Sequence, residues 1–227
     1  MQSSSDPARD LEERIGHRFA RPELAAAALT HRSARGPSNE RLEFLGDAVL
    51  GLAIAEALYA REPDLAEGDL TRMRASLVNR ESLAAVARSI DLGKILALGG
   101  GEKRSGGFQR RSILEDALEA VIGAVFMDAG YAAARSTVER LFGERLAALP
   151  HPDELKDPKT RLQEVLQGRG LSLPEYRIVD AGGPEHQRHF TAECRVPELD
   201  LLRSGSGRSR RRAEQAAAAQ LLEALEQ

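Results

Sequence analysis

The chain has 227 residues, of which 42% are hydrophobic and 30% are charged, and its formal net charge is −3. This composition excludes collagen-like, mucin-like and wholly disordered chains, and the length favours two domains. The single cysteine, Cys194, excludes an intramolecular disulfide and a cysteine-rich zinc site, so a bound metal would need oxygen ligands. Because we find neither an apolar run of about 18 residues nor a secretory signal, we expect a cytoplasmic protein with no membrane partner.

The first part of the sequence is expected to be helical almost throughout. It is rich in Ala and Leu, and its apolar residues recur at spacings of three and four. The expected helices span residues 8–16, 22–31, 38–60, 69–88, 110–129 and 132–148. The glycine-rich stretch Gly99–Gly107 is expected to be a mobile surface loop. The pattern predicts an all-α domain over residues 8–148.

The second part of the sequence has a different pattern of apolar residues. Residues 149–155 contain two prolines and no periodic pattern, which predicts a linker. A helix at 158–167 is followed by three strand-like runs, at 175–181, 187–196 and 199–204, and by a closing helix to about residue 226. This order predicts a small α+β domain, α-β-β-β-α, over residues 156–226. The expected fold class is therefore multidomain, with the all-α domain first.

The predicted helix at 38–60 carries three acids on one face. Glu40, Glu43 and Asp47 have the spacing i, i+3 and i+7, which confines them to an arc of about 60°. Apolar residues surround them, so we expect this helix to be buried nearly all round. The expected stripe opposite the acids is Leu42, Leu45, Val49 and Leu52, and the expected flanking residues are Phe44, Leu50 and Ile54. Acids in such a setting need a compensating charge, because desolvating them costs several kcal/mol.

A second group of acids lies in the predicted helix at 110–129. Asp116 and Glu119 share one face of it, and Glu67 stands just before the helix at 69–88, whose expected N-cap is Asp69. One such acid alone is more often a salt-bridged surface residue, but two acid pairs inside apolar helices make that explanation the weaker one. Clusters of carboxylates suit Mg²⁺ or Mn²⁺. The pattern points to metal-assisted hydrolysis of a phosphodiester.

Three consecutive arginines, Arg210, Arg211 and Arg212, begin the closing helix. The helix macrodipole disfavours cations at this end, and a phosphate partner would explain their placement. For an isolated run of three arginines the alternative is a solvated basic turn.

Several long motifs together resemble bacterial ribonuclease III. The segment Asn39–Asp47, NERLEFLGD, resembles the signature of that family. Around it LTHRS at 29–33, EGDLTRMR at 67–74 and RSILEDALEA at 111–120 are also similar, in the family's order. The segment from residue 157 to residue 213 is similar to the family's double-stranded-RNA-binding domain. The resemblance covers roughly residues 8–226.

The resemblance implies a function and a set of site residues. The family's helical nuclease domain acts as a homodimer and cuts both strands of an RNA duplex, leaving 5′-phosphate and 3′-hydroxyl ends with a short 3′ overhang; its usual work is the maturation of ribosomal RNA precursors and the trimming of messengers. No small-molecule cofactor is implied. By the family pattern, Mg²⁺, with Mn²⁺ as its substitute, is held by Glu43, Asp116 and Glu119. Asp47 is the essential acid beside the metal, and Glu40 and Glu67 assist in holding the substrate strand or metal-bound waters.

For the second domain the resemblance implies recognition of the A-form duplex by its shape. The residues assigned to RNA contacts are Thr160, Gln163, Gln167, His186, Arg210, Arg211 and Arg212. In the first domain, Glu115 is an additional acid where small residues are common in the family. Its direction, about 100° from that of Asp116, argues against a place in the site.

Two other functions are compatible with parts of this pattern. A double-stranded-RNA-binding protein that retains the fold without cutting is one, but the intact set of acids argues against it. A metal phosphohydrolase that acts on small nucleotides is the other, and it leaves the basic second domain unexplained. Incubation with long duplex RNA, with and without Mg²⁺, separates these functions.

Overall fold

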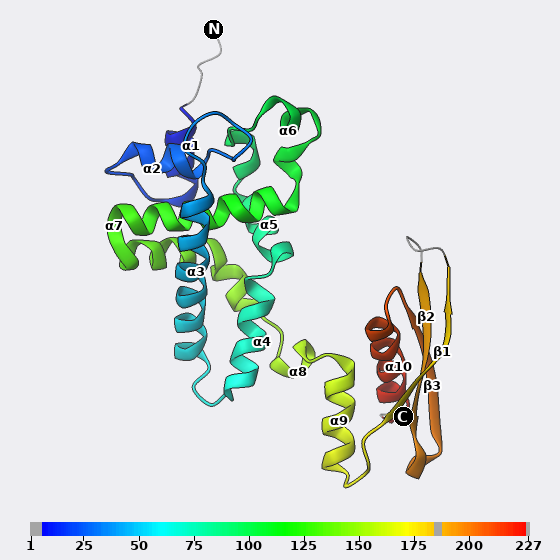
Figure 1. The fold of residues 1–227 in the computed structure, drawn as a ribbon. Helices are drawn as coiled ribbons and strands as arrows, with labels where there is room; N and C mark the ends of the chain where they lie inside the picture. The colour runs from blue at the N-terminus through cyan, green and yellow to red at the C-terminus, as the bar shows by residue number, and fades with distance from the viewer. Residues whose placement is uncertain (1–5, 184–187, 226–227) are drawn as a thin grey trace. The chain divides into compact units, whose positions relative to one another are not determined.

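The computed structural model describes residues 6–183 and 188–225. The chain divides into two compact units, Met1–Pro150 and His151–Gln227, which we describe separately. In Figure 1 the first unit consists of helices, coloured from blue to yellow-green, and the second combines helices with a sheet, coloured from yellow to red.

The first unit is built from helices, as its sequence predicts. They are α1 (Pro7–Ile15), α2 (Pro22–Ala28), α3 (Glu40–Arg61), α4 (Glu67–Leu77), α5 (Arg80–Ser89), α6 (Gly100–Arg104) and α7 (Arg111–Ala147), with short 3-10 turns at Leu92–Ile95 and Gly107–Gln109. Inside α7, Gly130 has φ 77° and ψ −174°, which a residue with a side chain rarely adopts. This kink falls where the sequence predicts a break between two helices.

Three local expectations are wrong. The helix expected at 69–88 is two helices, because the side chain of Asn79 accepts a hydrogen bond from the backbone N–H of Ser82 and starts α5 anew. Helix α4 begins at Glu67, so Asp69 lies inside its first turn, paired with Arg72, and is not the N-cap. The glycine-rich stretch at 99–107 contains α6, and it is anchored where the N–H of Gly99 donates to Ser33 Oγ at 2.9 Å.

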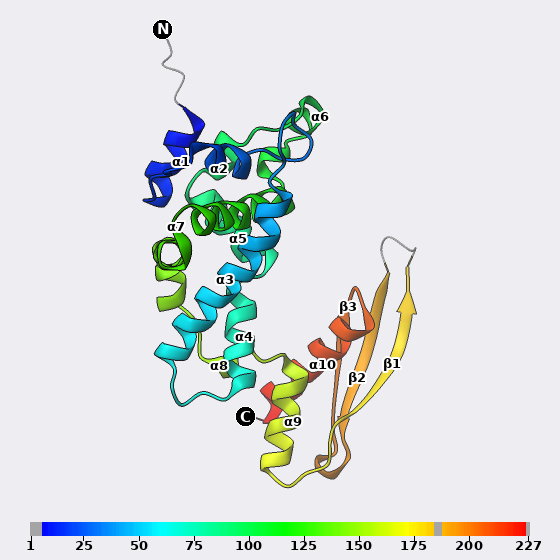
Figure 2. The same ribbon diagram turned by 60° about the vertical axis from the view of Figure 1, so that its left-hand side comes forward.

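Helices α3 and α7 cross at a pair of glycines, and Figures 1 and 2 show the crossing from two directions. A Cβ atom on Gly46 would lie 1.8 Å from the carbonyl oxygen of Glu119. A Cβ atom on Gly123 would lie 2.2 Å from the carbonyl oxygen of Leu42. The two backbones are therefore in direct contact, at a distance that only glycine permits.

Helix α3 is not buried all round. Phe44 is 82% exposed and Leu52 is 57% exposed, so the expected apolar stripe is wrong at Leu52. Leu50 and Ile54, which were expected beside the acids, are buried together with Val49. The reason is that α3 packs on α7 through one face only and leaves the opposite face open.

One helix in the described part of the chain, α7, is long and apolar enough to cross a membrane by length and composition alone. Half of its most apolar window is buried inside the structure. Leu114, Leu118, Val121 and Val125 of this helix are all buried. The helix therefore forms the centre of the core of the first unit.

The second unit has the predicted order of elements. These are α8 (Pro152–Leu155), α9 (Pro158–Gly168), β1 (Glu175–Gly182), β2 (His189–Val196), β3 (Leu201–Gly207) and α10 (Arg210–Leu225). The strands form an antiparallel sheet in the order β1-β2-β3, in which Cys194 pairs with Tyr176 on one side and Arg203 on the other. The strand β3 ends at Gly207, three residues beyond the end of the strand-like run expected at 199–204.

The core of this unit lies between the sheet and the helices α9 and α10. It is lined by Leu162, Leu166, Cys194, Val196, Ala217, Ala218, Leu221 and Leu222. Cys194 is thus a small buried core residue, as its strand pattern predicts. A Cβ atom on Gly205 would lie 2.1 Å from the backbone nitrogen of Ala217, so glycine lets α10 rest directly on β3.

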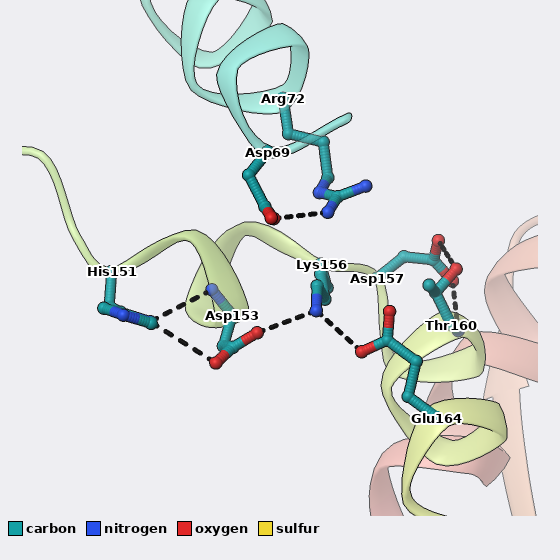
Figure 3. A network of polar contacts seen from close by, with 8 residues as sticks. All are labelled: Asp69, Arg72, His151, Asp153, Lys156, Asp157, Thr160 and Glu164. Atoms are coloured by element: carbon teal, nitrogen blue, oxygen red, sulfur yellow. Dashed lines mark hydrogen bonds and ion pairs between the residues drawn. The ribbon is translucent and has the colours of Figure 1, made fainter. Parts of the chain in front are cut away.

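A polar network joins α8 to α9, as Figure 3 shows. Lys156 Nζ donates to Asp153 at 2.8 Å and to Glu164 at 2.7 Å. Before it, the side chain of His151 accepts from the backbone N–H of Asp153 and caps α8. Residues 152–155, part of the segment expected to be a linker, are therefore helical and tied to the second unit.

The crossing of α3 and α7 can be tested with two glycines of the same helix. We expect Gly123→Ala to lower the free energy of unfolding by more than about 2 kcal/mol, because the new methyl group overlaps the backbone of α3. Gly143→Ala is the matched control: nothing lies within 4 Å of its Cβ position, so we expect a gain of up to about 1 kcal/mol from helix propensity. Urea unfolding followed by circular dichroism measures both, and equal effects would contradict the close contact.

Candidate active site

The acids of α3 and α7 gather beside the glycine crossing. On α3, Gly46 lies between Glu43 and Asp47, and it meets α7 at the backbone of Glu119. Burial, followed by the charges of Asp47, Glu115, Glu43 and Asp116, raises the pKa of Glu119 to about 8. The structure thus brings together the four acids that the resemblance assigns to the metal centre and its immediate surroundings.

Burial differs among these acids. Glu119 is 9% exposed, Glu43 and Asp116 are half-buried, and Asp47 is exposed. Burial also raises the pKa of Glu43 and of Asp116, and a neighbouring carboxylate adds to each shift. Negative charge is therefore concentrated in this cluster.

A cleft of about 200 Å³ opens beside the cluster. It is lined by His31, Arg32, Asn39, Glu40, Glu43 and Asp116. Arg32 Nη1 lies 3.8 Å from Glu40 Oε1, and Glu40 also accepts from Ser38 Oγ at 2.9 Å. The exposed Glu40 therefore forms the outer wall of the cleft.

His31 is a site residue that the sequence did not identify. It is 9% exposed, and its Nδ1 lies 2.7 Å from Ser33 Oγ, which in turn accepts from the N–H of Gly99. The charges of His31 and Arg32 lower the pKa of Asp116, against the larger effect of burial. Both residues lie in the LTHRS segment, for which the sequence analysis predicted no role. The only indication in the sequence that they belong to the site was the position of this segment close to NERLEFLGD.

Glu115, expected to lie outside the site, belongs to it electrostatically. Its carboxylate accepts a hydrogen bond from Arg80 Nε at 2.5 Å, and its charge raises the pKa of Glu43, Asp116 and Glu119. In the sequence analysis, the angle of about 100° between neighbouring helix positions argued that Glu115 does not share a face with Asp116. It did not exclude an effect of charge, which depends on distance and on the local dielectric constant and does not require a shared face.

Glu67 is not brought to the cluster within its own chain. It is the exposed first residue of α4, and its carboxylate accepts from Thr71 Oγ1 at 2.8 Å. Helix α4 follows the C-terminal end of α3, which lies about 27 Å along the helix axis from Glu43. Glu67 and Glu43 are therefore near opposite ends of α3.

The donor set fits a hard divalent cation. Over residues 6–183 and 188–225, no three Asp, Glu, His or Cys side chains are already arranged as the ligands of a metal ion. The chemistry of the cluster nevertheless matches such an ion, because several carboxylates repel one another around a buried member and oxygen donors are what Mg²⁺ and Mn²⁺ prefer.

In the second unit the three arginines Arg210, Arg211 and Arg212 are exposed at the start of α10, where Ser209 Oγ accepts from the N–H of Arg212 at 3.2 Å. On α9, Gln163 is half-buried and Gln167 is exposed. The hydroxyl of Thr160 donates to Asp157, the N-cap of this helix, at 2.9 Å, as Figure 3 shows. His186 lies outside the described residues.

The buried charge of Glu119 predicts how stability depends on pH. The unfolded chain ionises this group at its ordinary pKa of 4.5, whereas the folded chain retains the proton up to about pH 8. We therefore expect the free energy of unfolding, measured with urea in the presence of a chelator, to fall as pH rises from about 5 to 8. Glu119→Gln should flatten this slope and be more stable than the parent at pH 8 by at least about 1 kcal/mol.

Glu139→Gln is the matched control for this experiment. Glu139 is an exposed acid of the same helix and pairs with Arg135 at 2.9 Å. The control should keep the slope of the parent, and a Glu119→Gln protein that also keeps it would show that Glu119 is not the source of the pH dependence.

Comparison with known proteins matches both units to known families. A family model described as Ribonuclease-III-like matches residues 21–146, and one described as Double-stranded RNA binding motif matches residues 158–225. The protein called Ribonuclease 3 from Alkalilimnicola ehrlichii is 51% identical over 216 residues, which cover 95% of each chain. The Ribonuclease 3 of Methylococcus capsulatus is 52% identical over 215 residues, which cover 95% of this chain and 94% of that protein.

The fold of the first unit is matched by solved structures. The nuclease domain of ribonuclease III from Campylobacter jejuni is 40% identical, and the match covers 66% of this chain and 100% of that chain with a TM-score of 0.60. A second structure of that domain is 43% identical with a TM-score of 0.58, covering 60% of this chain and 95% of that one. The chain therefore belongs to the ribonuclease III family of divalent-metal-dependent nucleases and is an endoribonuclease specific for double-stranded RNA.

Proposed function

We propose that the protein uses Mg²⁺, with Mn²⁺ as a substitute, to hydrolyse one phosphodiester bond in each strand of an RNA duplex. The products carry 5′-phosphate and 3′-hydroxyl ends with a short 3′ overhang. The observation that supports this proposal is the buried Glu119 surrounded by the carboxylates of α3 and α7. The proposal extends to a cytoplasmic homodimer that processes ribosomal RNA precursors and some messenger and transfer RNAs.

Each acid has a distinct place in this proposal. Glu43, Asp116 and Glu119 would hold the Mg²⁺, which supplies an activated water for the attack on phosphorus and neutralises the charge that develops there. Burial fixes Glu119 in position, while Asp47 beside it is exposed and would act as the essential acid next to the metal. Glu40, oriented by Arg32 and Ser38, would hold the substrate strand at the outer wall of the cleft.

Glu67 lies apart from the other acids of the proposed site. In its own chain it lies near the far end of α3 and has no contact with the acids of the cluster among the described residues. Its proposed assistance to the substrate strand therefore cannot act through the cleft of its own subunit.

The second unit would bind the duplex without reading its sequence. The exposed Arg210, Arg211 and Arg212 offer three guanidinium groups to backbone phosphates. Gln163 and Gln167, one turn apart on α9, can donate to 2′-hydroxyl groups in the minor groove. The hydroxyl of Thr160 donates to Asp157 and can accept from a 2′-hydroxyl group, and His186 is assigned to the same set of contacts. Because these contacts are to phosphates and sugars, affinity should follow the shape of the A-form helix.

The exposed face of α3 supports a homodimer. Phe44, Leu52 and Tyr59 lie on this helix at spacings of eight and seven residues and are 82%, 57% and 76% exposed. Large apolar side chains grouped in this way are typical of an interface. The related nuclease domain from Campylobacter jejuni has a region involved in dimer formation. A two-fold dimer would also supply one cutting centre for each strand of a duplex.

The decisive experiment for the enzymatic function uses Glu119→Gln. We expect single-turnover cleavage of a long RNA duplex in Mg²⁺ to fall by at least about 10³-fold, because a metal ligand is lost while the packing of the site is retained. Duplex binding in a gel shift should remain within about twofold of the parent. A folded variant that cuts at the parent rate would overturn the assignment, and a parent that binds duplex RNA without ever cutting it would favour the non-cutting alternative.

The dimer proposal is tested at Phe44. A carboxylate at this position would be buried without a partner in the interface, so Phe44→Glu should shift the protein from dimer to monomer at micromolar concentration in analytical ultracentrifugation. Phe108→Glu is the control, because Phe108 is also exposed, at 42%, but lies in the turn before α7. A parent protein that sediments as a monomer and still makes staggered double cuts would contradict the proposal.

A further inference from the structure

Arg80 is held beside the acid cluster in an unusual way. It is the first residue of α5, and its side chain is 67% exposed. Its Nε nevertheless donates to Glu115 Oε2 at 2.5 Å, and Glu115, on α7 next to Asp116, is only 16% exposed. A side chain that extends into solvent is therefore fixed at its base by a partly buried acid.

The packing of α5 does not require this ion pair. Leu83, Ala84 and Ala87 of α5 are completely buried, and α5 packs along α7. An ion pair whose guanidinium lies in water adds little to stability. Its orientation of Arg80 therefore needs another explanation.

The hydrogen bond through Nε leaves the outer part of the guanidinium available. The hydrogen bond from Arg80 to Glu115 uses Nε, and the Arg80 side chain is 67% exposed, so we take the outer end of its guanidinium to face solvent. A guanidinium presents its terminal N–H groups as a planar fork that matches two oxygens of a phosphate. Because Glu115 fixes the plane of this fork, less conformational entropy is lost when a phosphate binds.

The negative charge of the site makes a nearby cation that binds RNA phosphates favourable. An RNA strand that reaches the metal ligands must bring its phosphates close to the carboxylates of Glu43, Asp47 and Asp116, which repel it. The charges of Arg80 and Arg32 both lower the pKa of Asp116. Arg32 already faces Glu40, whereas the outer end of Arg80 is open.

We propose that Arg80, oriented by Glu115, binds the phosphate next to the one that is cut and thereby draws the RNA strand onto the acid cluster. This inference rests on the proposed cleavage of duplex RNA. It assigns a substrate-binding role to Arg80 and a positioning role to Glu115, the acid that stands where small residues are common in the family.

The test begins with Arg80→Gln, whose amide keeps a donor for Glu115 but lacks the charge and the fork. Duplex binding is measured in a chelator over a range of salt concentrations, and cleavage is measured in Mg²⁺. We expect the Kd and KM to rise about three- to tenfold with kcat within twofold, and the salt slope of binding to fall by about 1 for each phosphate that Arg80 no longer binds. Arg9→Gln is the matched control, because Arg9 is an exposed arginine beside Glu13 on α1, and it should leave all these values unchanged.

Glu115 is tested by two substitutions. Glu115→Ala frees the guanidinium of Arg80, so we expect a higher KM with an unchanged salt slope, because the charge remains and only its orientation is lost. Glu115→Gln keeps an oxygen that accepts from Nε and should restore the KM. If Glu115 instead ligates the metal, Glu115→Gln will raise the Mg²⁺ concentration needed for half-maximal thermal stabilisation, and that result would overturn its positioning role.

Two further comparisons separate the role of Arg80 in binding from an effect on folding and from the proposed function itself. Should Arg80→Gln destabilise the fold in thermal unfolding, the double variant Arg80→Gln/Glu115→Gln removes both charges of the pair and must show the same rise in KM. If the parent cuts duplex RNA while Arg80→Gln keeps the parent KM and salt slope, the inference fails and the proposed function stands. If the parent does not cut at all, the proposed function itself fails.

Discussion

The architecture of the first unit depends on the contact between α3 and α7 at Gly46 and Gly123. Because a Cβ atom on Gly46 would overlap the carbonyl oxygen of Glu119, the backbone that carries one acid of the cluster touches the helix that carries two others. Acids on two ordinary helices 8–10 Å apart would be further from each other. The absence of a side chain at Gly46 and at Gly123 thus sets the distance between the acids of α3 and those of α7, across which they could bind one metal ion.

The same contact explains why the site is a source of instability in the absence of metal. Packing α3 against α7 buries Glu119 among like charges, which costs free energy that the apolar core of α7 must offset. A divalent cation reverses the sign of this interaction, because the carboxylates that repel one another all attract it. The cluster of carboxylates is therefore the cause both of the unfavourable electrostatic energy of the site and of its affinity for a metal ion.

The sequence predicted the order of the elements and the acids of the cluster, because helical periodicity and the motif NERLEFLGD are local signals. It failed where the outcome depends on tertiary contacts. Leu52 follows the apolar pattern of α3 as well as Leu50 does, and only the packing on α7 decides which of them is buried. Likewise, the pairing of Arg80 with Glu115 joins residues 35 positions apart, and no spacing rule reports it. His31 lines the cleft from a segment that is held by a distant part of the chain, since its N–H donates to the carbonyl oxygen of Ala97.

The helix α8 shortens the connection between the two units. Since Lys156 ties α8 to α9, only residues 148–151 lie between the end of α7 and the first turn of the second unit. Four residues span at most about 14 Å. A duplex captured by the second unit therefore meets the acid cluster as a tethered reactant, at an effective concentration that can reach the millimolar range for a short connection. Even a weak nuclease unit would then work at a high local concentration of its substrate.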